Sequence, residues 1–280
     1  MRKGLVIAVA TGCLFFSCQD RKMTNAFDEG DDADGDSLEA FAGDTLHLFD
    51  EDEPPVAVDE LFDDFLYNFI DDAKFQGQRI QFPLPCKEGE REERLTVDDW
   101  PEFDHFKNQD LLSVIYEREQ DYELSKDTSM QSVAVEWIGL KDDAVQNFHF
   151  NRVAGKWMLT QIDKRTRNEM PGGDFLNFYA HFVADSVFQR EALADPVKVI
   201  LTSEDGEDEP EVEHVNADEW FEMKESLPLP QNVIVNVNYG QASISQNRKI
   251  MLLQGLGNGM QMKFRFNKDG EDWKLMEIEY

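Results

Sequence analysis

Hydrophobic residues recur at helical spacing in two separate stretches of the chain. The first stretch, 58–75, places six apolar side chains on one helical face: Leu61, Phe62, Phe65, Leu66, Phe69 and Ile70. The second, 174–188, repeats this face with Phe175, Phe178, Tyr179, Phe182 and Val183. Downstream of each stretch the apolar residues alternate with polar ones, most clearly at Met260, Met262, Phe264 and Phe266. The pattern predicts helices followed by half-buried antiparallel strands, twice over.

The two halves also match residue by residue. Eight positions agree at an offset of 113, namely Phe62, Phe65, Leu66, Phe69, Phe75, Gln76, Ile80 and Pro83 with Phe175, Phe178, Tyr179, Phe182, Phe188, Gln189, Leu193 and Pro196. Six more agree at an offset of 116, namely Phe148, Phe150, Asn151, Trp157, Leu159 and Ile162 with Phe264, Phe266, Asn267, Trp273, Leu275 and Ile278. A turn-rich stretch, 166–174, separates the copies. We expect an α+β fold with two repeat domains, 58–165 and 172–280, each with N-terminal helices packed on a curved antiparallel sheet.

The N-terminus has the features of a secretory signal. Arg2 and Lys3 precede an apolar segment, 4–16, which is shorter than the roughly 20 residues of a membrane-spanning helix. The segment ends before Cys18 and resembles a bacterial lipoprotein signal, in which the cysteine is lipidated. We expect residues 1–17 to be the signal peptide and Cys18 the lipidation site. Cys13 is a competing lipidation site, and plain secretion is a third reading.

The overall charge narrows the classes of partner. The formal net charge is −31, which argues against nucleic-acid binding, because that affinity comes from cationic side chains on phosphates. Residues 18–57 are acidic and aperiodic, and they predict a disordered tether. Asp32, Asp34 and Asp36 alternate as in a calcium loop, but the turn glycine and the twelfth ligand are misplaced. Cys86, which remains after signal removal and lipidation, is expected to be a small buried residue.

With these features assembled, each repeat resembles a nuclear transport factor 2-like domain, a cone of helices on a curved sheet. The tandem pair behind a lipoprotein signal is similar to a group of lipoproteins from Gram-negative bacteria, the domain of unknown function 4348. The resemblance covers about 58–280 and includes no catalytic motif. It implies a fold and leaves the activity open, because this fold hosts enzymes, ligand binders and interaction modules.

A residue that occurs in both copies of the repeat is expected to be structural, and this criterion applies to each candidate catalytic residue. Asp98 and Asp99 in "TVDDW" form a carboxylate pair, but "NADEW" at 216–220 repeats the spacing of a capping box, so we expect helix caps at Thr96 and Asn216. The histidines share no metal-ligand spacing, and no nucleophile motif occurs. The sequence therefore predicts no catalytic, cofactor-binding or metal-binding residue. Trp137 aligns with Leu253, and this difference between the copies makes Trp137 the candidate pocket or interaction residue.

These observations predict a lipoprotein of the cell envelope, anchored in a membrane, with the outer membrane expected, through lipidated Cys18. Its repeat domains are expected to bind a protein partner or a small ligand without catalysis or a cofactor. The alternative is a pocket enzyme of the isomerase or hydrolase type in one of the cones. Two acidic stretches, 86–95 and 203–214, are expected to be solvated loops, and the alternative for them is a patch that steers a basic partner.

Overall fold

The computed structural model describes residues 56–280, apart from 101–105, 107–108, 203–208, 242 and 244–246. The predicted signal peptide, Cys18 and the tether up to residue 55 lie outside the described residues. Asp52–Tyr280 is one compact unit. Among the helices that the structure describes, none combines the length and the apolar character needed to cross a bilayer.

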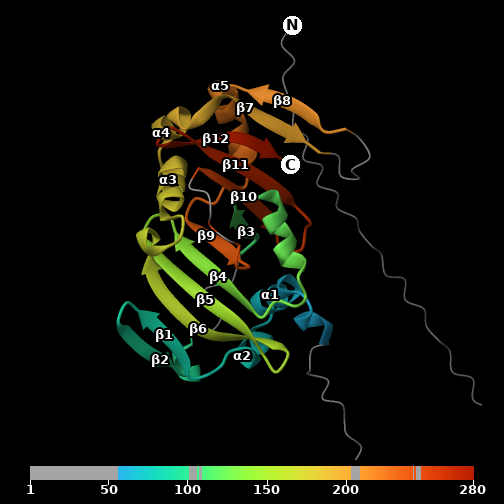
Figure 1. Ribbon diagram of the computed structural model, residues 1–280, viewed down its shortest axis with the longest axis vertical. Coiled ribbons are helices and arrows are strands. Elements are labelled where there is room, and N and C mark those ends of the chain that lie inside the picture. Colours follow the sequence, from blue (N-terminus) through green and yellow to red (C-terminus); the bar gives the residue numbers. More distant parts are fainter. Residues whose placement is uncertain (1–55, 101–105, 107–108, 203–208, 242, 244–246) are drawn as a thin grey trace, which may run out of the picture. The chain divides into compact units, whose positions relative to one another are not determined.

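The order of elements is repeated along the chain (Figure 1). The first copy contains η1 (Val56–Asp59), α1 (Phe62–Asp71), α2 (Ala73–Gln78), β1 (Leu84–Glu88), β2 (Arg91–Leu95), η2 (Val97–Asp99), β3 (Leu111–Tyr116), η3 (Glu119–Lys126), β4 (Ser132–Gly139), β5 (Ala144–Val153) and β6 (Lys156–Thr166). The second contains η4 (Arg167–Glu169), α3 (Gly173–Ala184), α4 (Ser186–Glu191), β7 (Leu193–Leu201), β8 (Glu211–Val215), α5 (Ala217–Met223), η5 (Lys224–Ser226), β9 (Val233–Asn238), β10 (Arg248–Gly255), β11 (Gln261–Asp269) and β12 (Asp272–Glu279). The predicted α+β class is confirmed.

The break between the two helices of each copy has the same local cause. The Asp72 carboxylate accepts hydrogen bonds from the backbone N–H groups of Lys74, at 2.8 Å, and Phe75, at 3.1 Å. Asp185 caps α4 in the same way, at 2.8 and 3.1 Å. The aspartate has an extended backbone conformation, which ends the first helix. Its side chain accepts hydrogen bonds from the unpaired N–H groups at the start of the next helix.

The twelve strands of the described residues belong to one sheet, in the order β2-β1-β6-β5-β4-β9-β3-β10-β11-β12-β7-β8. The order shows that the copies exchange their third strands. β9 of the second copy pairs with β4, with Asn238 opposite Ala134, and β3 of the first copy pairs with β10, with Tyr116 opposite Ile250. β3 and β9 meet in the centre as a parallel pair with a single matched position, Ser113 and Asn236. The predicted division into two separate cones stays a prediction, because the copies share this sheet.

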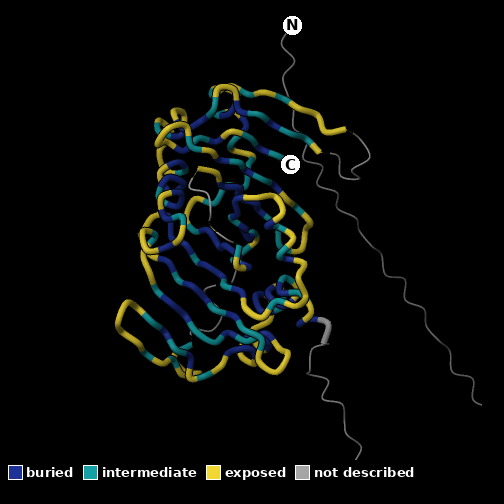
Figure 2. The backbone as a smooth tube through the Cα atoms, in the orientation of Figure 1, coloured by how far each residue is buried: buried dark blue, intermediate teal, exposed yellow. Residues whose placement is uncertain are grey.

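The exchanged strands separate two hydrophobic cores. On β10, Ile250 and Leu252 face the core of the first half, which is covered by α1 and α2, and Met251 and Leu253 face the core of the second. Figure 2 shows that buried residues follow these central strands, whereas exposed ones gather on the outer hairpins. The sequence of a strand that is buried on both faces is a continuous apolar run, as in "IMLL" at 250–253.

Several local predictions are confirmed. Capping boxes join Thr96 to Asp99 and Asn216 to Glu219. The loop prediction for the acidic stretches is wrong for 86–88, which lie in β1, and for 91–95 and 211–214, which lie in the strands β2 and β8. The strands β2 and β8 form the two edges of the sheet, and their charged residues suit an edge, where they oppose pairing with a further strand. The same charges hide the strands from a search for hydrophobic alternation.

Candidate functional site

Trp137, the residue singled out by the repeat, lies on β4 and is partly buried against the first core. Its ring contacts Phe106 edge to face, with 6.1 Å between centroids. It also lines a hollow of about 260 Å³ together with Lys141, Asp142 and Gln146. Its counterpart Leu253 is fully buried. A binding role for Trp137 stays a prediction, since the structure gives this side chain both a packing role and an accessible edge.

His149, His181 and Cys86 lie where the repeat placed them, on polar faces and in the core respectively. His149 is on the outer, polar face of β5, and its Nε2 lies 2.9 Å from an Asp163 carboxylate oxygen. The corresponding pair in the second half is Arg265 and Glu279, at 2.6 Å. Cys86 is buried, and this burial raises the pKa of its thiol. Among the described residues no three His, Cys, Asp or Glu side chains are grouped to hold a metal ion.

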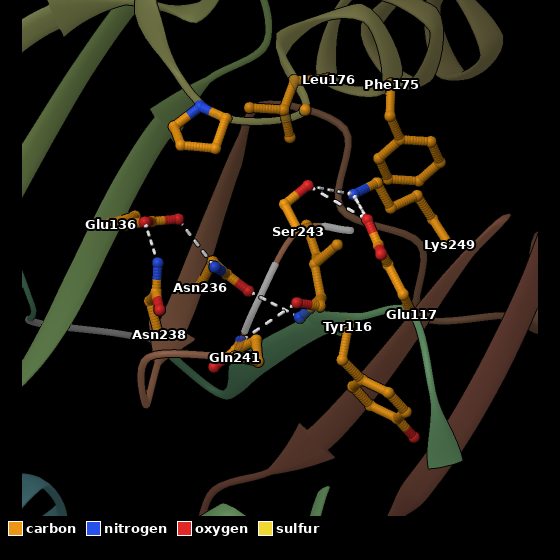
Figure 3. A pocket seen from close by; sticks show the side chains of 13 residues that line it. Tyr116, Glu117, Glu136, Phe175, Leu176, Asn236, Asn238, Gln241, Ser243 and Lys249 are labelled. Atoms are coloured by element: carbon orange, nitrogen blue, oxygen red, sulfur yellow. Dashed lines mark hydrogen bonds and ion pairs between the residues drawn. The ribbon is translucent and has the colours of Figure 1, made fainter. Parts of the chain in front are cut away.

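The structure brings together a second group of polar residues that the sequence reading missed (Figure 3). This central polar pocket lies where the exchanged strands meet, beneath the first turn of α3. Its polar residues come from β4, β9, β10 and the adjoining loops, and its roof is apolar. They are Glu117, Glu136, Asn236, Asn238, Gln241, Ser243 and Lys249, with Phe175 and Leu176 above them.

Glu136 is the buried acid of this pocket. Asn236 donates from Nδ2 to Oε2 of Glu136 at 2.7 Å, and Asn238 donates to Oε1 at 2.8 Å. Burial raises the pKa of Glu136, and the two amide donors offset this shift only in part. A buried carboxyl with a raised pKa is a common feature of catalytic acids and bases, so this residue needs a specific test.

A buried ion pair occupies the other side of the pocket. Nζ of Lys249 lies 2.6 Å from Oε1 of Glu117, and both side chains are less than a tenth exposed. Lys249 also donates to Oγ of Ser243 at 3.1 Å, and Ser243 donates to Glu117 at 3.0 Å. A serine next to a lysine is a known nucleophile arrangement, but it needs a lysine that can accept a proton. Here the amine is a donor to both neighbours, so the arrangement favours structure over catalysis.

The amides of the pocket complete the backbone bonding of the central strands. The N–H of Ile115 donates to Oδ1 of Asn236 at 2.9 Å, and Nε2 of Gln241 donates to the Ile115 carbonyl at 3.0 Å. Because β3 and β9 match at a single position, their backbone groups need such partners. The polar residues therefore hold the strand exchange together.

The free space in the pocket is small. Its volume is about 60 Å³, enough for a few water molecules and well below the roughly 300 Å³ of small ligand sites. Gly172, the N-cap of α3, lies beside it with a φ of 76°, and a Cβ there would lie 3.3 Å from Nζ of Lys249. Among the described residues, close packing of the helix on the ion pair leaves a space smaller than a typical ligand site.

The pocket is present once, although the scaffold is present twice. The pairing registers make Leu252 the counterpart of Glu136, Val133 that of Lys249, and Val114 and Tyr116 those of Asn236 and Asn238. All four counterparts are buried in the first core. The sequence does contain a signal, because Glu136, Asn236 and Asn238 interrupt otherwise apolar strands. Their convergence depends on the exchange of strands and could not be predicted.

A larger hollow, the Trp273 groove, opens on the surface of the second half between α3, α4 and the β11–β12 hairpin. Its volume is about 610 Å³. The aromatic part of its lining consists of Phe178, Phe188 and Trp273, and the remainder is Asp174, Glu191, Ala192, Lys268, Glu271, Asp272 and Lys274. Asp174 accepts from Nε1 of Trp273 at 3.2 Å and pairs with Lys268 at 2.9 Å. This volume is within the range of ligand sites.

The corresponding space of the first half is filled by the chain itself. Arg79, the counterpart of Ala192, lies with its guanidinium 4.7 Å from the centroid of Phe75. It pairs with both oxygens of Asp59, at 3.0 and 2.9 Å, and donates to the Trp157 carbonyl at 3.4 Å. Asp59 in turn accepts from the N–H of Trp157 at 2.8 Å. In the first half an internal arginine therefore fills this space, and in the second half the space is open.

Comparisons with known proteins bear on this architecture. A family model described as a domain of unknown function (DUF4348) matches residues 43–280. Among solved structures, an NTF2-like protein from Bacteroides fragilis NCTC 9343 is 36% identical, with a TM-score of 0.73. The alignment covers 81% of this chain and 98% of that one. No curated protein matches the chain.

Proposed function

Because the chain belongs to the DUF4348 family and has an NTF2-like fold, we propose that it is a non-catalytic binding protein of the cell envelope. In this proposal Cys18 carries the lipid that anchors it to a membrane, the outer membrane in the first instance. The folded residues that follow the tether bind a protein partner.

The observation that carries the binding role is the Trp273 groove. Three aromatic side chains form its apolar part, and its space is open to solvent, whereas the space beside Trp157 is occupied by Arg79. Aromatic residues that line a hollow are the usual anchors of a binding site, because they bury a large apolar area at low entropic cost. The central polar pocket favours binding over catalysis as well, since its acid is buried and both its acid and its serine are already hydrogen-bonded.

The experiment compares matched positions in the two halves. Glu191 and Gln78 are both the last residue of a short helix, both exposed, and equivalent at an offset of 113. A photo-reactive amino acid at Glu191 in cells is expected to cross-link a discrete partner, and the same residue at Gln78 is expected to give none. Equal cross-linking from both positions, or none from Glu191, would contradict a binding role for the groove.

Anchoring has its own test. Cys18→Ala is expected to move the protein from the membrane fraction to the soluble fraction, because a lipid chain on this residue is the proposed attachment. The Cys86→Ala variant is the matched control, since that thiol is buried in the fold. If Cys18→Ala stays with the membrane, another segment holds the protein there.

A further inference from the structure

The two halves differ at one position that decides whether the groove is open. Arg79 and Ala192 are the C-cap residues of α2 and α4, with similar backbone angles, φ −106° and ψ 17° against φ −87° and ψ 6°. Their carbonyls make equivalent hydrogen bonds, to the N–H of Leu159 at 2.8 Å and of Leu275 at 2.9 Å. An arginine in the second half would therefore point into the groove, as Arg79 points toward Trp157.

The surroundings that hold the Arg79 side chain are largely retained in the second half. Phe188 replaces Phe75 as the aromatic ring beside the guanidinium, and one face of this ring is stacked on His181, with 3.9 Å between ring centroids. The Trp273 carbonyl corresponds to the Trp157 carbonyl that accepts from Arg79. What is missing is the guanidinium itself and its partner Asp59, whose counterpart is Gly172.

Negative charge at the rim takes the place of the missing aspartate. Four acidic residues line the groove against two lysines. Lys268 is paired with Asp174, and Lys274 lies 3.7 Å from Asp269. Glu191, Glu271 and Asp272 are exposed, and none of the three has an ion-pair partner among the described residues. The rim therefore favours a cationic ligand, and the net charge of −31 would attract one over a distance.

From this juxtaposition we infer that the Trp273 groove binds an arginine side chain presented by a protein partner, in the position that Arg79 occupies internally in the first half. The guanidinium stacks on Phe188 and donates to the Trp273 carbonyl and the rim carboxylates. A planar guanidinium suits both the ring and the fork of acceptors better than an ammonium does. This inference rests on the proposed binding function and names the chemical class of the partner.

The test uses the purified full-length protein and three short peptides. These are acetyl-Gly-Arg-Gly-amide and the same peptide with citrulline or lysine in place of arginine. Citrulline has nearly the same shape without the charge. Binding is followed by NMR through the indole N–H signal of Trp273, which is assigned with Trp273→Phe. The arginine peptide is expected to bind at least about tenfold more tightly than the citrulline peptide, with lysine between them.

A variant supplies the internal competitor. Ala192→Arg is expected to weaken binding of the arginine peptide by at least about tenfold, because its own guanidinium fills the groove. Gln78→Arg, which adds the same charge on the exposed surface of the first half, is expected to bind as the native protein does. Equal affinity for the arginine and citrulline peptides would overturn the inference even if Ala192→Arg failed to fold. If Glu191 still cross-links a partner while the arginine peptide does not bind, the binding function stands and the arginine specificity fails.

Discussion

The two halves of this molecule share an order of helices and strands but differ at two equivalent places. Beside Trp157 the first half buries its own arginine, and beside Trp273 the second half leaves a groove. In the centre, Glu136, Asn236 and Asn238 of one site correspond to Leu252, Val114 and Tyr116 of the other. The repeated positions therefore maintain the scaffold. The positions that differ mark where one copy has a surface or a polar pocket of its own.

Arg79→Ala is expected to lower the free energy of unfolding more than the other variants proposed here. The change leaves Asp59 buried without its partner, which costs about 3–5 kcal/mol in the free energy of unfolding. Urea unfolding followed by fluorescence measures it. Ala192→Arg, the reciprocal change, is expected to cost much less, because its guanidinium remains near solvent and the rim carboxylates. If Ala192→Arg lowers the free energy of unfolding as much as Arg79→Ala does, the groove cannot hold an arginine in the way the first half does.

Lys249→Ala is expected to cause the second largest loss of stability. It removes the buried partner of Glu117 and destabilises the protein by about 3 kcal/mol, with Ser243 and a few waters still available to the carboxylate. Val133→Ala at the equivalent position removes only apolar volume, and we expect a loss of about 1–2 kcal/mol. Thermal unfolding of the two variants side by side checks the difference. Equal losses would contradict a special role for the ion pair.

Glu136→Gln tests the pH dependence that the polar pocket confers. The folded protein holds a proton on Glu136 more tightly than the unfolded chain, because burial raises its pKa above the ordinary 4.5. Stability from this group is therefore highest below pH 4.5 and is lost as the pH rises through the raised pKa. The variant is expected to abolish this component of the pH profile of unfolding, whereas Glu92→Gln on the exposed edge strand β2 serves as the control.

The capping boxes are expected to give the smallest effect. Asn216→Ala removes the cap of α5, whose side chain accepts from the N–H groups of Asp218 and Glu219, and costs about 1 kcal/mol. Thr96→Ala removes the cap of the short turn Val97–Asp99 and is expected to cost less, since fewer turns depend on it. Chemical denaturation of both variants measures the difference. A larger loss for Thr96→Ala would reverse the expected ranking of the two caps.

Much of the fold could be predicted from the residues because its signals are local. The aromatic faces of α1 and α3, the caps at Thr96 and Asn216, and the hairpin glycines Gly155 and Gly270 each depend on a few neighbouring residues. The edge strands β2 and β8 were missed because charged residues interrupt the apolar alternation in both of them. The candidate sites were missed because Glu136 and Asn236 lie 100 residues apart and meet only across the exchanged strands.

By itself the sequence determined the repeat, the α+β class, the helix caps and the buried side of most elements, since these follow from spacing and local hydrogen bonding. Only the tertiary structure decided which strand pairs with which, because the backbone hydrogen-bonding groups of a strand are nearly the same whatever its sequence. That pairing places the polar residues together beneath α3. The groove beside Trp273 likewise depends on packing, because the step from Arg79 to Ala192 opens a space only where aromatic side chains already line it.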